Sequence, residues 1–190
     1  MSHDKRRFDP KHQHHLLNSE RQAHWDPPHF LARFGLRPGQ TVLDLGCGPG
    51  FWTLPLAEWV GETGQVWAID ASQELLDALA ARNPPPQVRL AHAELPAIDV
   101  PDASVDLALV AFVFHEVEPP ERLASELRRV LRPGARVAVL EWRPDAESDQ
   151  GPPRAHRLTP EQVMTWLRAA GLAAHETWQD ADSYLVEAFA

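Results

Sequence analysis

The sequence predicts an α/β fold with a doubly wound, mostly parallel sheet, and three features support this. A short apolar run, Thr41 to Leu45, is followed by glycines at every second position, Gly46, Gly48 and Gly50. Strand-like and helix-like segments then alternate along most of the chain, and the last two strand-like segments follow each other directly. Alternation favours a parallel sheet with helices on both faces, and the final pair predicts an antiparallel hairpin.

Each expected element has its own local signal. Ser72 is a typical N-cap residue for a helix, and the three prolines after Asn83 end that helix. Pro133-Gly134 breaks the next helix, and Thr159-Pro160 begins the last one. Strands are expected at 41–45, 64–70, 88–90, 105–114, 136–142, 173–178 and 183–189, and helices at 51–60, 72–82, 119–131 and 159–170.

The glycine loop after the first strand predicts a ligand site. Glycines there let backbone N–H groups approach a ligand without a Cβ in the way. The spacing differs from the dinucleotide fingerprint, because the third glycine comes two residues after the second and Phe51 follows it. Asp44 lies two residues before Gly46, and an acid beside such a loop suits a ligand that carries a cation. The alternative is a plain glycine turn in an ordinary α/β protein.

The segment Val42-Leu43-Asp44-Leu45-Gly46-Cys47-Gly48-Pro49-Gly50 resembles the first motif of the class I S-adenosylmethionine-dependent methyltransferases. The resemblance runs from about Phe30 to Ala190. It implies a Rossmann-like, seven-stranded sheet of order 3-2-1-4-5-7-6 and S-adenosylmethionine as cofactor. The implied cofactor-binding residues in this motif are Asp44, Gly46, Cys47, Gly48 and Gly50. Ubiquinone/menaquinone-type methyltransferases share this general pattern, but no quinone-specific signature is present.

Residues at the ends of the next strands complete the expected cofactor site. Asp70 closes the second strand, where the family's acid accepts hydrogen bonds from both ribose hydroxyls; a solvated strand-end acid is the alternative. His92-Ala93-Glu94 resembles the family's adenine-reading loop, in which an Asp usually precedes the Ala. Neutral His92 can accept a hydrogen bond but an imidazolium cannot, so either the Ala93 backbone or Glu94 is the alternative reader. Ala71 and Phe112 are the remaining expected cofactor contacts.

Two residues are candidates for catalysis, His115 after the fourth strand and Glu141 near the end of the fifth. Adjacent strand ends should bring both side chains toward one cavity, where either can serve as a general base. The alternatives are a buried histidine bonded to backbone and a glutamate that caps a loop. A base is needed only if the acceptor loses a proton, because the sulfonium methyl is already activated.

The acceptor site is expected in the least regular segments. Residues 1–35 are interpreted as an N-terminal arm or lid and residues 36–190 as the single methyltransferase domain. The linker Arg143 to Leu158 is expected to cross near the mouth of the pocket. His12-x-His14-His15 is either a metal site or part of a mobile arm. The aromatic residues considered for an acceptor pocket are Trp25, Trp52, Phe112, Phe114 and Trp142.

Composition narrows the class of substrate. The chain has 190 residues and a net charge of −9, and residues 41–190 hold eleven Lys/Arg against 23 Asp/Glu. An acidic body disfavours a nucleic-acid substrate, since phosphate binding needs a basic face. The only cysteine, Cys47, excludes an internal disulfide and a set of thiolates that could hold arsenic or another metal. No apolar run reaches membrane length and the start of the chain is charged, so a cytoplasmic protein is expected.

The sequence therefore predicts a small-molecule methyltransferase that transfers a methyl group from S-adenosylmethionine by in-line displacement. Oxygen, nitrogen and carbon acceptors all stay open, and so does the oligomeric state. The alternative is a non-catalytic S-adenosylmethionine-binding regulator or partner protein. A nicotinamide-dependent oxidoreductase is a more distant third hypothesis.

Overall fold

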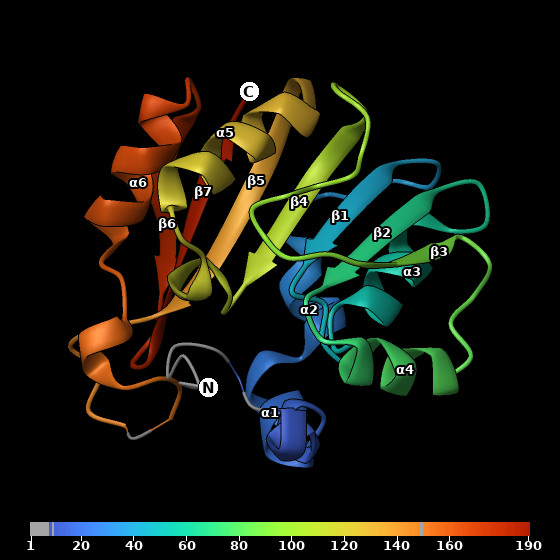
Figure 1. Cartoon of the computed structure of the whole chain (residues 1–190), viewed down its shortest axis with the longest axis horizontal. Helices are drawn as coiled ribbons and strands as arrows, with labels where there is room; N and C mark the ends of the chain where they lie inside the picture. The colour runs from blue at the N-terminus through green and yellow to red at the C-terminus, as the bar shows by residue number, and fades with distance from the viewer. Residues whose placement is uncertain (1–7, 9, 149) are drawn as a thin grey trace. The chain divides into compact units, whose positions relative to one another are not determined.

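The computed structural model describes residue 8 and residues 10–148 and 150–190. The seven strands form a sheet of order β3-β2-β1-β4-β5-β7-β6 (Figure 1). This order and the antiparallel strands at the C-terminal edge confirm the predicted fold class. The chain divides into two compact units, Phe8–Glu94 and Leu95–Ala190. The boundary expected at residue 35 between an arm and a single domain stays a prediction.

The first unit contains three parallel strands and the glycine loop. The strands lie side by side in Figure 1, with Asp44 opposite Ala68 and Asp70 opposite His92. Residues 42–45 are buried, as expected for a strand whose two faces are both covered. Ser72 caps the helix that follows β2, as predicted: its side chain accepts the N–H of Leu75. The elements are β1 (Thr41–Leu45), α3 (Thr53–Val60), β2 (Gln65–Asp70), α4 (Gln73–Ala81) and β3 (Val88–His92).

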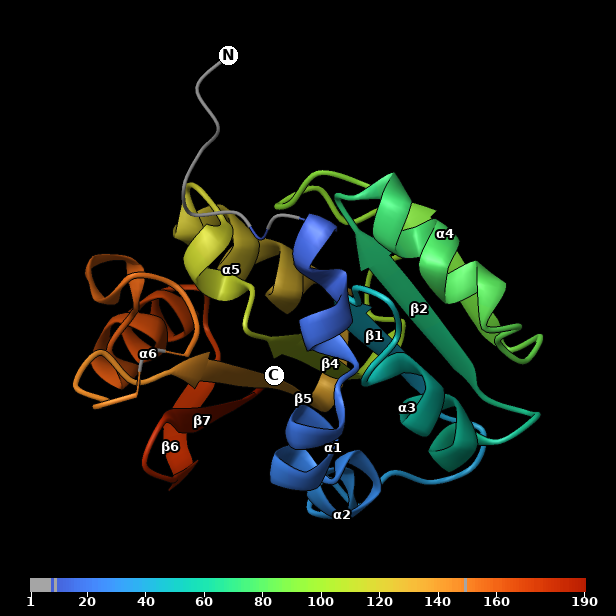
Figure 2. The same ribbon diagram turned by 90° about the horizontal axis from the view of Figure 1, so that it is seen from below.

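Short helices precede β1 in the same unit: η1 (Pro10–Leu16), α1 (Ser19–Trp25) and α2 (Pro27–Ala32). Asn18 caps α1 by accepting the N–H of Arg21 at 2.8 Å. Trp25 and Phe30 are buried, and both rings contact Trp52. Figures 1 and 2 place α1 on the side of the unit at which β1 and β2 end. This segment is therefore packed on its own unit, and its action as a lid stays a prediction.

The second unit carries the other four strands. β4 (Val105–Ala111) and β5 (Leu131–Trp142) are parallel, and β7 (Ser183–Phe189) runs antiparallel to both β5 and β6 (Ala173–Gln179). The predicted C-terminal hairpin is thereby confirmed. The helical elements are η2 (Phe114–Glu116), α5 (Pro120–Val130), η3 (Arg154–His156) and α6 (Pro160–Ala169). Thr159 and Gln162 cap α6 reciprocally, as the Thr-Pro-Glu-Gln sequence favours.

Several predicted boundaries are wrong, and three of them bear on the site or the sheet. The fourth strand ends at Ala111 rather than Phe114, because Phe112 adopts a left-handed backbone conformation with φ +61° and turns the chain. The fifth strand begins at Leu131 and continues through Pro133-Gly134, where a separate turn was expected. The first predicted helix begins at Thr53 rather than Phe51. None of the helices within the described ranges is long and apolar enough to cross a membrane.

Candidate functional site

The glycine loop is held over the end of β2 by backbone hydrogen bonds. The N–H groups of Gly46 and Cys47 both donate to the Ile69 carbonyl, at 2.8 and 3.1 Å. Gly48 and Gly50 have φ angles of +52° and +87°, which side chains strongly disfavour. The alternating glycines therefore meet a backbone requirement, and the loop is fixed before any ligand arrives.

Asp70 links this loop to the loop after β2. Its Oδ2 accepts the Gly48 N–H at 2.8 Å, and its Oδ1 accepts the Ser72 N–H at 2.8 Å. Burial raises the pKa of Asp70, and these backbone hydrogen bonds only partly oppose that rise. The carboxylate has about four acceptor sites, and the Ala71 N–H also hydrogen-bonds to it, so a site is left for a ligand hydroxyl. The geometry thus leaves room for a hydrogen bond from a ligand hydroxyl, while giving Asp70 a structural role that sequence reasoning missed.

Asp44 is 1% exposed and is buried more deeply than Asp70. The Thr53 hydroxyl donates to its Oδ2 at 2.6 Å, whereas Oδ1 has no hydrogen-bond partner among the described residues. Burial raises the pKa of Asp44 to about 7; the Thr53 hydrogen bond lowers it and the charge of Asp70 raises it further. A buried acceptor without a partner is unusual in a native protein and suits a cationic ligand group.

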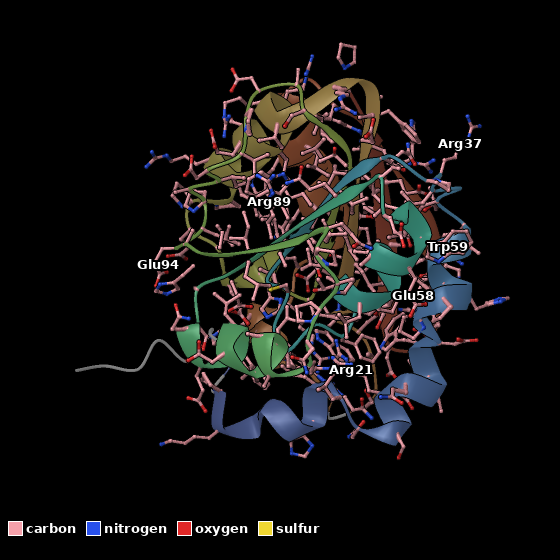
Figure 3. The ribbon with its side chains drawn as sticks, turned by 90° about the vertical axis from the view of Figure 1, so that its right-hand side faces the viewer. Arg21, Arg37, Glu58, Trp59, Arg89 and Glu94 are labelled. Atoms are coloured by element: carbon pink, nitrogen blue, oxygen red, sulfur yellow. The ribbon has the colours of Figure 1, made fainter. Side chains whose placement is uncertain are left out.

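His92 and its neighbours lie beside the end of β2. The His92 Nε2 is 3.0 Å from the Ala71 carbonyl, which can only accept, so Nε2 carries the proton. Nδ1 of the neutral ring is then an acceptor, as reading an amino group requires. The Ala93 N–H donates to the Asp70 carbonyl at 3.1 Å. Glu94 is exposed and points outward in Figure 3. The choice among these readers stays a prediction.

In the second unit, His115 and Glu141 form a buried hydrogen-bonded pair. The His115 Nδ1 lies 3.0 and 2.9 Å from the two carboxylate oxygens of Glu141, and its backbone N–H donates to Oε1 at 3.1 Å. Glu141 is fully buried and also accepts the Trp142 N–H. The structure thus brings both candidate catalytic residues together. Glu141 orients the His115 ring through Nδ1, so Nε2 is the ring nitrogen that Glu141 does not contact.

The charge state of His115 reflects opposing influences. Burial by itself would lower the pKa of His115, but the Glu141 carboxylate and the more distant Glu116 raise it, and the net shift is upward. Arg157 opposes the rise. The Glu116 carboxylate is 3.8 Å from Nε2. The ring is therefore a stronger base than an ordinary histidine, as proton removal from a weakly acidic group requires.

The aromatic residues considered for a pocket separate into two groups. Phe112 and Trp142 contact each other with ring centroids 4.6 Å apart, next to the His115–Glu141 pair along the chain. Phe114 stacks on Trp166 of α6 at 5.9 Å and is a core residue. Trp25 and Trp52 belong to the packed aromatic cluster of the first unit. Trp142 is buried like these three residues, so of the five aromatics Phe112 alone, which is half-buried, stays a candidate for acceptor contacts on packing grounds.

Arg157 organises the linker between β5 and α6. Its guanidinium donates to the carbonyls of Arg143, Gln150 and Pro152. A Cβ on Gly151 would lie 2.7 Å from the Trp142 ring, so the linker backbone packs directly on that ring. Sequence reasoning missed Arg157 because an arginine in a polar, proline-rich linker carries no local signal of burial.

Thr53 was also missed, although a hydroxyl three residues after the glycine loop is the signal that could have identified it. No cluster of three potential metal ligands occurs in the described part of the chain. The possible metal site at His12, His14 and His15 involves two side chains outside that part.

Comparison with known proteins places these features in context. A family model described as a methyltransferase domain matches residues 42–134. A structure of a SAM-dependent methyltransferase from Aquifex aeolicus is 33% identical, with a TM-score of 0.88, and the alignment covers 96% of this chain and 99% of that one.

Two curated relatives are similar over part of their length. The 2-phytyl-1,4-naphtoquinone methyltransferase of Trichormus variabilis is 40% identical over 112 residues, which cover 57% of this chain and 49% of the relative. The ubiquinone/menaquinone biosynthesis C-methyltransferase UbiE of Cupriavidus taiwanensis is 35% identical over 164 residues, covering 81% of this chain and 60% of the relative. The chain thus spans half to three-fifths of these relatives.

Proposed function

Because the chain belongs to the class I S-adenosylmethionine-dependent methyltransferases, we propose that it transfers a methyl group from S-adenosylmethionine to a small-molecule acceptor by in-line displacement. The observation that carries this proposal is the loop Gly46–Gly50 with its two acids. The Asp70 carboxylate keeps an acceptor site, and the Oδ1 of Asp44 has no hydrogen-bond partner among the described residues. A ligand with a ribose and an ammonium group supplies a hydroxyl donor for Asp70 and a cationic donor for Asp44.

The residues of the first unit fit each part of this cofactor. Asp70 accepts from the ribose hydroxyls, and Asp44 faces the ammonium of the methionine portion. His92 Nδ1 or the Ala93 backbone reads the adenine edge, with His92 held by the Ala71 carbonyl. When bound, S-adenosylmethionine supplies a methyl group activated by its sulfonium. The protein then has to position two reactants and exclude water, which accounts for much of the rate in such displacements.

His115 and Glu141 supply the proton transfer that an acidic acceptor needs. Glu141 accepts from Nδ1 and fixes the ring, so that Nε2 removes a proton from the acceptor. The upward pKa shift of His115 strengthens this base, and the carboxylate stabilises the imidazolium that forms. Glu141 is thus a positioning residue and His115 the catalytic base.

The acceptor we propose is an aromatic ring with an acidic hydroxyl group. The names of the relatives from Trichormus variabilis and Cupriavidus taiwanensis refer to quinone-type compounds. The half-buried Phe112, whose ring packs on Trp142, offers a ring surface next to the base along the chain. Methylation at carbon or at oxygen is compatible with this chemistry.

The first experiment is calorimetric titration with S-adenosylhomocysteine, with NAD as the matched control. We expect a dissociation constant in the micromolar range for S-adenosylhomocysteine, which corresponds to roughly −8 kcal/mol, and no heat with NAD. Incubation with methyl-labelled S-adenosylmethionine and a set of phenols and reduced quinones then tests transfer. Binding of NAD without S-adenosylhomocysteine would refute the cofactor. Cofactor binding without transfer to any acceptor would favour the non-catalytic alternative.

A further inference from the structure

The linker between β5 and α6, residues 143–158, is fastened to its own unit at both ends (Figure 1). At its start, the Arg143 N–H donates to the Asp182 carbonyl at 2.8 Å, in the turn between β6 and β7. At its end, the Tyr184 hydroxyl donates to the Leu158 carbonyl at 2.9 Å. Burial raises the pKa of Tyr184, so this hydroxyl stays a neutral donor. The stretch between these two points needs contacts of its own to hold it in place.

A buried arginine ties the middle of the linker together. Arg157 is 8% exposed, and its guanidinium donates to the carbonyls of Gln150 and Pro152, which flank Gly151. A third donation, at 3.1 Å, reaches the carbonyl of Arg143 at the start of the linker. Each carbonyl is contacted by a different nitrogen of the planar fork, which the single nitrogen of a lysine does not reproduce.

The segment that Arg157 holds packs on a ring next to Phe112, the half-buried aromatic residue that stays a candidate for acceptor contacts. A Cβ on Gly151 would overlap the Trp142 ring, so the Gly151 backbone lies directly on that ring. The Trp142 ring in turn packs on the Phe112 ring, with centroids 4.6 Å apart. Arg157 therefore supports Phe112 through two successive contacts, from Gly151 to Trp142 and from Trp142 to Phe112.

The charge of Arg157 also acts on the His115–Glu141 pair. The Arg143 carbonyl that it holds is two residues after Glu141, whose carboxylate binds the His115 ring. Burial and the Arg157 charge lower the pKa of His115, whereas Glu141 from β5 and Glu116 from η2 raise it. An imidazolium has no free acceptor, so a cation that opposes its formation keeps the ring available as a base.

We propose that Arg157 is a positioning residue of the reaction, which fixes the Trp142–Phe112 pair through the linker and keeps a positive charge acting on the His115 ring. This inference deepens the proposed function and rests on it, because His115 serves as a base only if the acceptor loses a proton. The two effects depend on different properties of one side chain. The fork of donors holds the linker, and the charge keeps the His115 ring free to accept a proton.

Two substitutions separate these properties. Arg157→Met removes both the fork and the charge, whereas Arg157→Lys keeps the charge and loses the fork. Arg168→Met is the matched control, because this arginine of the same unit also donates to a backbone carbonyl through two nitrogens. Its partner is the carbonyl of Ala174, which lies in β6 rather than in the linker.

Three measurements on the whole chain report the two effects. NMR titration of the ligand-free protein gives the pKa of His115, and a His115→Gln variant identifies its signal. Hydrogen exchange of residues 143–158 reports opening of the linker. Initial rates of methyl transfer to a phenolic acceptor, measured across pH, give kcat and KM.

We expect the pKa of His115 to rise in Arg157→Met and to stay near the wild-type value in Arg157→Lys, since only the methionine variant loses the opposing charge. The acid limb of the kcat profile should move to higher pH with it, which lowers kcat near pH 7 about three- to tenfold in Arg157→Met. In both Arg157 variants, linker exchange should be about tenfold faster and the acceptor KM about three- to tenfold higher. Arg168→Met should change none of these quantities.

An unchanged pKa of His115 in Arg157→Met, or equal rises in both Arg157 variants, would overturn the role of the charge. Unchanged linker exchange and KM in both variants would overturn the role of the fork. If Arg157→Met does not fold, Arg157→Gln replaces it, because its neutral amide can still donate to a linker carbonyl. A wild type that methylates no acceptor overturns the proposed function, while titration and exchange still decide both effects of Arg157.

Discussion

Replacing Asp44 with asparagine tests the central electrostatic feature of the glycine-loop unit. The asparagine keeps the shape of the side chain and an oxygen for the Thr53 hydroxyl, but it removes the ionisable group. Burial raises the pKa of Asp44 from 3.8 to about 7, so the folded wild type holds a proton between about pH 4 and 7 that the unfolded chain has released. Stability therefore falls as the pH rises through this window, by on the order of 4 kcal/mol in total.

The Asp44→Asn variant lacks this pH-dependent loss of stability. Between pH 4 and pH 8 without ligand, its free energy of unfolding should improve relative to wild type by up to about 4 kcal/mol. Urea denaturation at pH 4, 6 and 8 measures the difference. Thr53→Val serves as the matched control, because loss of the hydroxyl donor moves the pKa of Asp44 further upward and shifts the wild-type pattern to higher pH.

Ligand binding should show the opposite preference. An ammonium group binds ionised Asp44, so wild-type affinity for S-adenosylhomocysteine should be about tenfold weaker at pH 6 than at pH 8. In the Asp44→Asn variant the affinity should be lower at pH 8 and nearly independent of pH. The reasoning is refuted if the two proteins have parallel stability profiles, or if the variant binds the ligand as well as wild type with the same dependence on pH.

Three further predictions concern single residues. Asp70→Ala should weaken S-adenosylhomocysteine binding on the order of a hundredfold, and a loss of affinity under threefold would contradict the ribose role. The same variant should lose about 1–3 kcal/mol of stability, because the Gly48 and Ser72 N–H groups lose their acceptor. His115→Ala should lower turnover by about 10²–10⁴-fold. Glu141→Gln should move the acid limb of the pH–rate profile to lower pH, since the Glu141 carboxylate raises the pKa of His115. If that limb does not move, His115 is not the base. Gly50→Ala should cost about 2–4 kcal/mol in denaturant unfolding, because the new Cβ would overlap a methyl of buried Leu79 at a residue with a positive φ. Gly171→Ala, with φ +86° and open space around the new Cβ, should cost about 1 kcal/mol, and equal costs for the two variants would show that packing is irrelevant.

The sequence by itself determined the elements whose signals are local. All seven strands could be located from their apolar runs, and helix ends from the Ser72 and Thr159 caps and the proline breaks. Periodicity, capping and proline geometry all act within a few residues. The glycine spacing with Asp44 indicated the cofactor class for the same reason: loop, strand end and helix start are contiguous in the chain. The sequence could not place the end of β4, since nothing local predicts a left-handed Phe112.

The tertiary structure decided which groups share an environment. It joined Asp70 to Gly48, 22 residues apart, and His115 to Glu141, 26 residues apart. It also left the Oδ1 of Asp44 without a partner among the described residues while raising its pKa to about 7. Burial and hydrogen bonding are properties of neighbours in space, and residue identity along the chain does not specify them. Arg157 shows this most clearly: an arginine with no motif around it is held by three backbone carbonyls only because the folded linker surrounds its side chain.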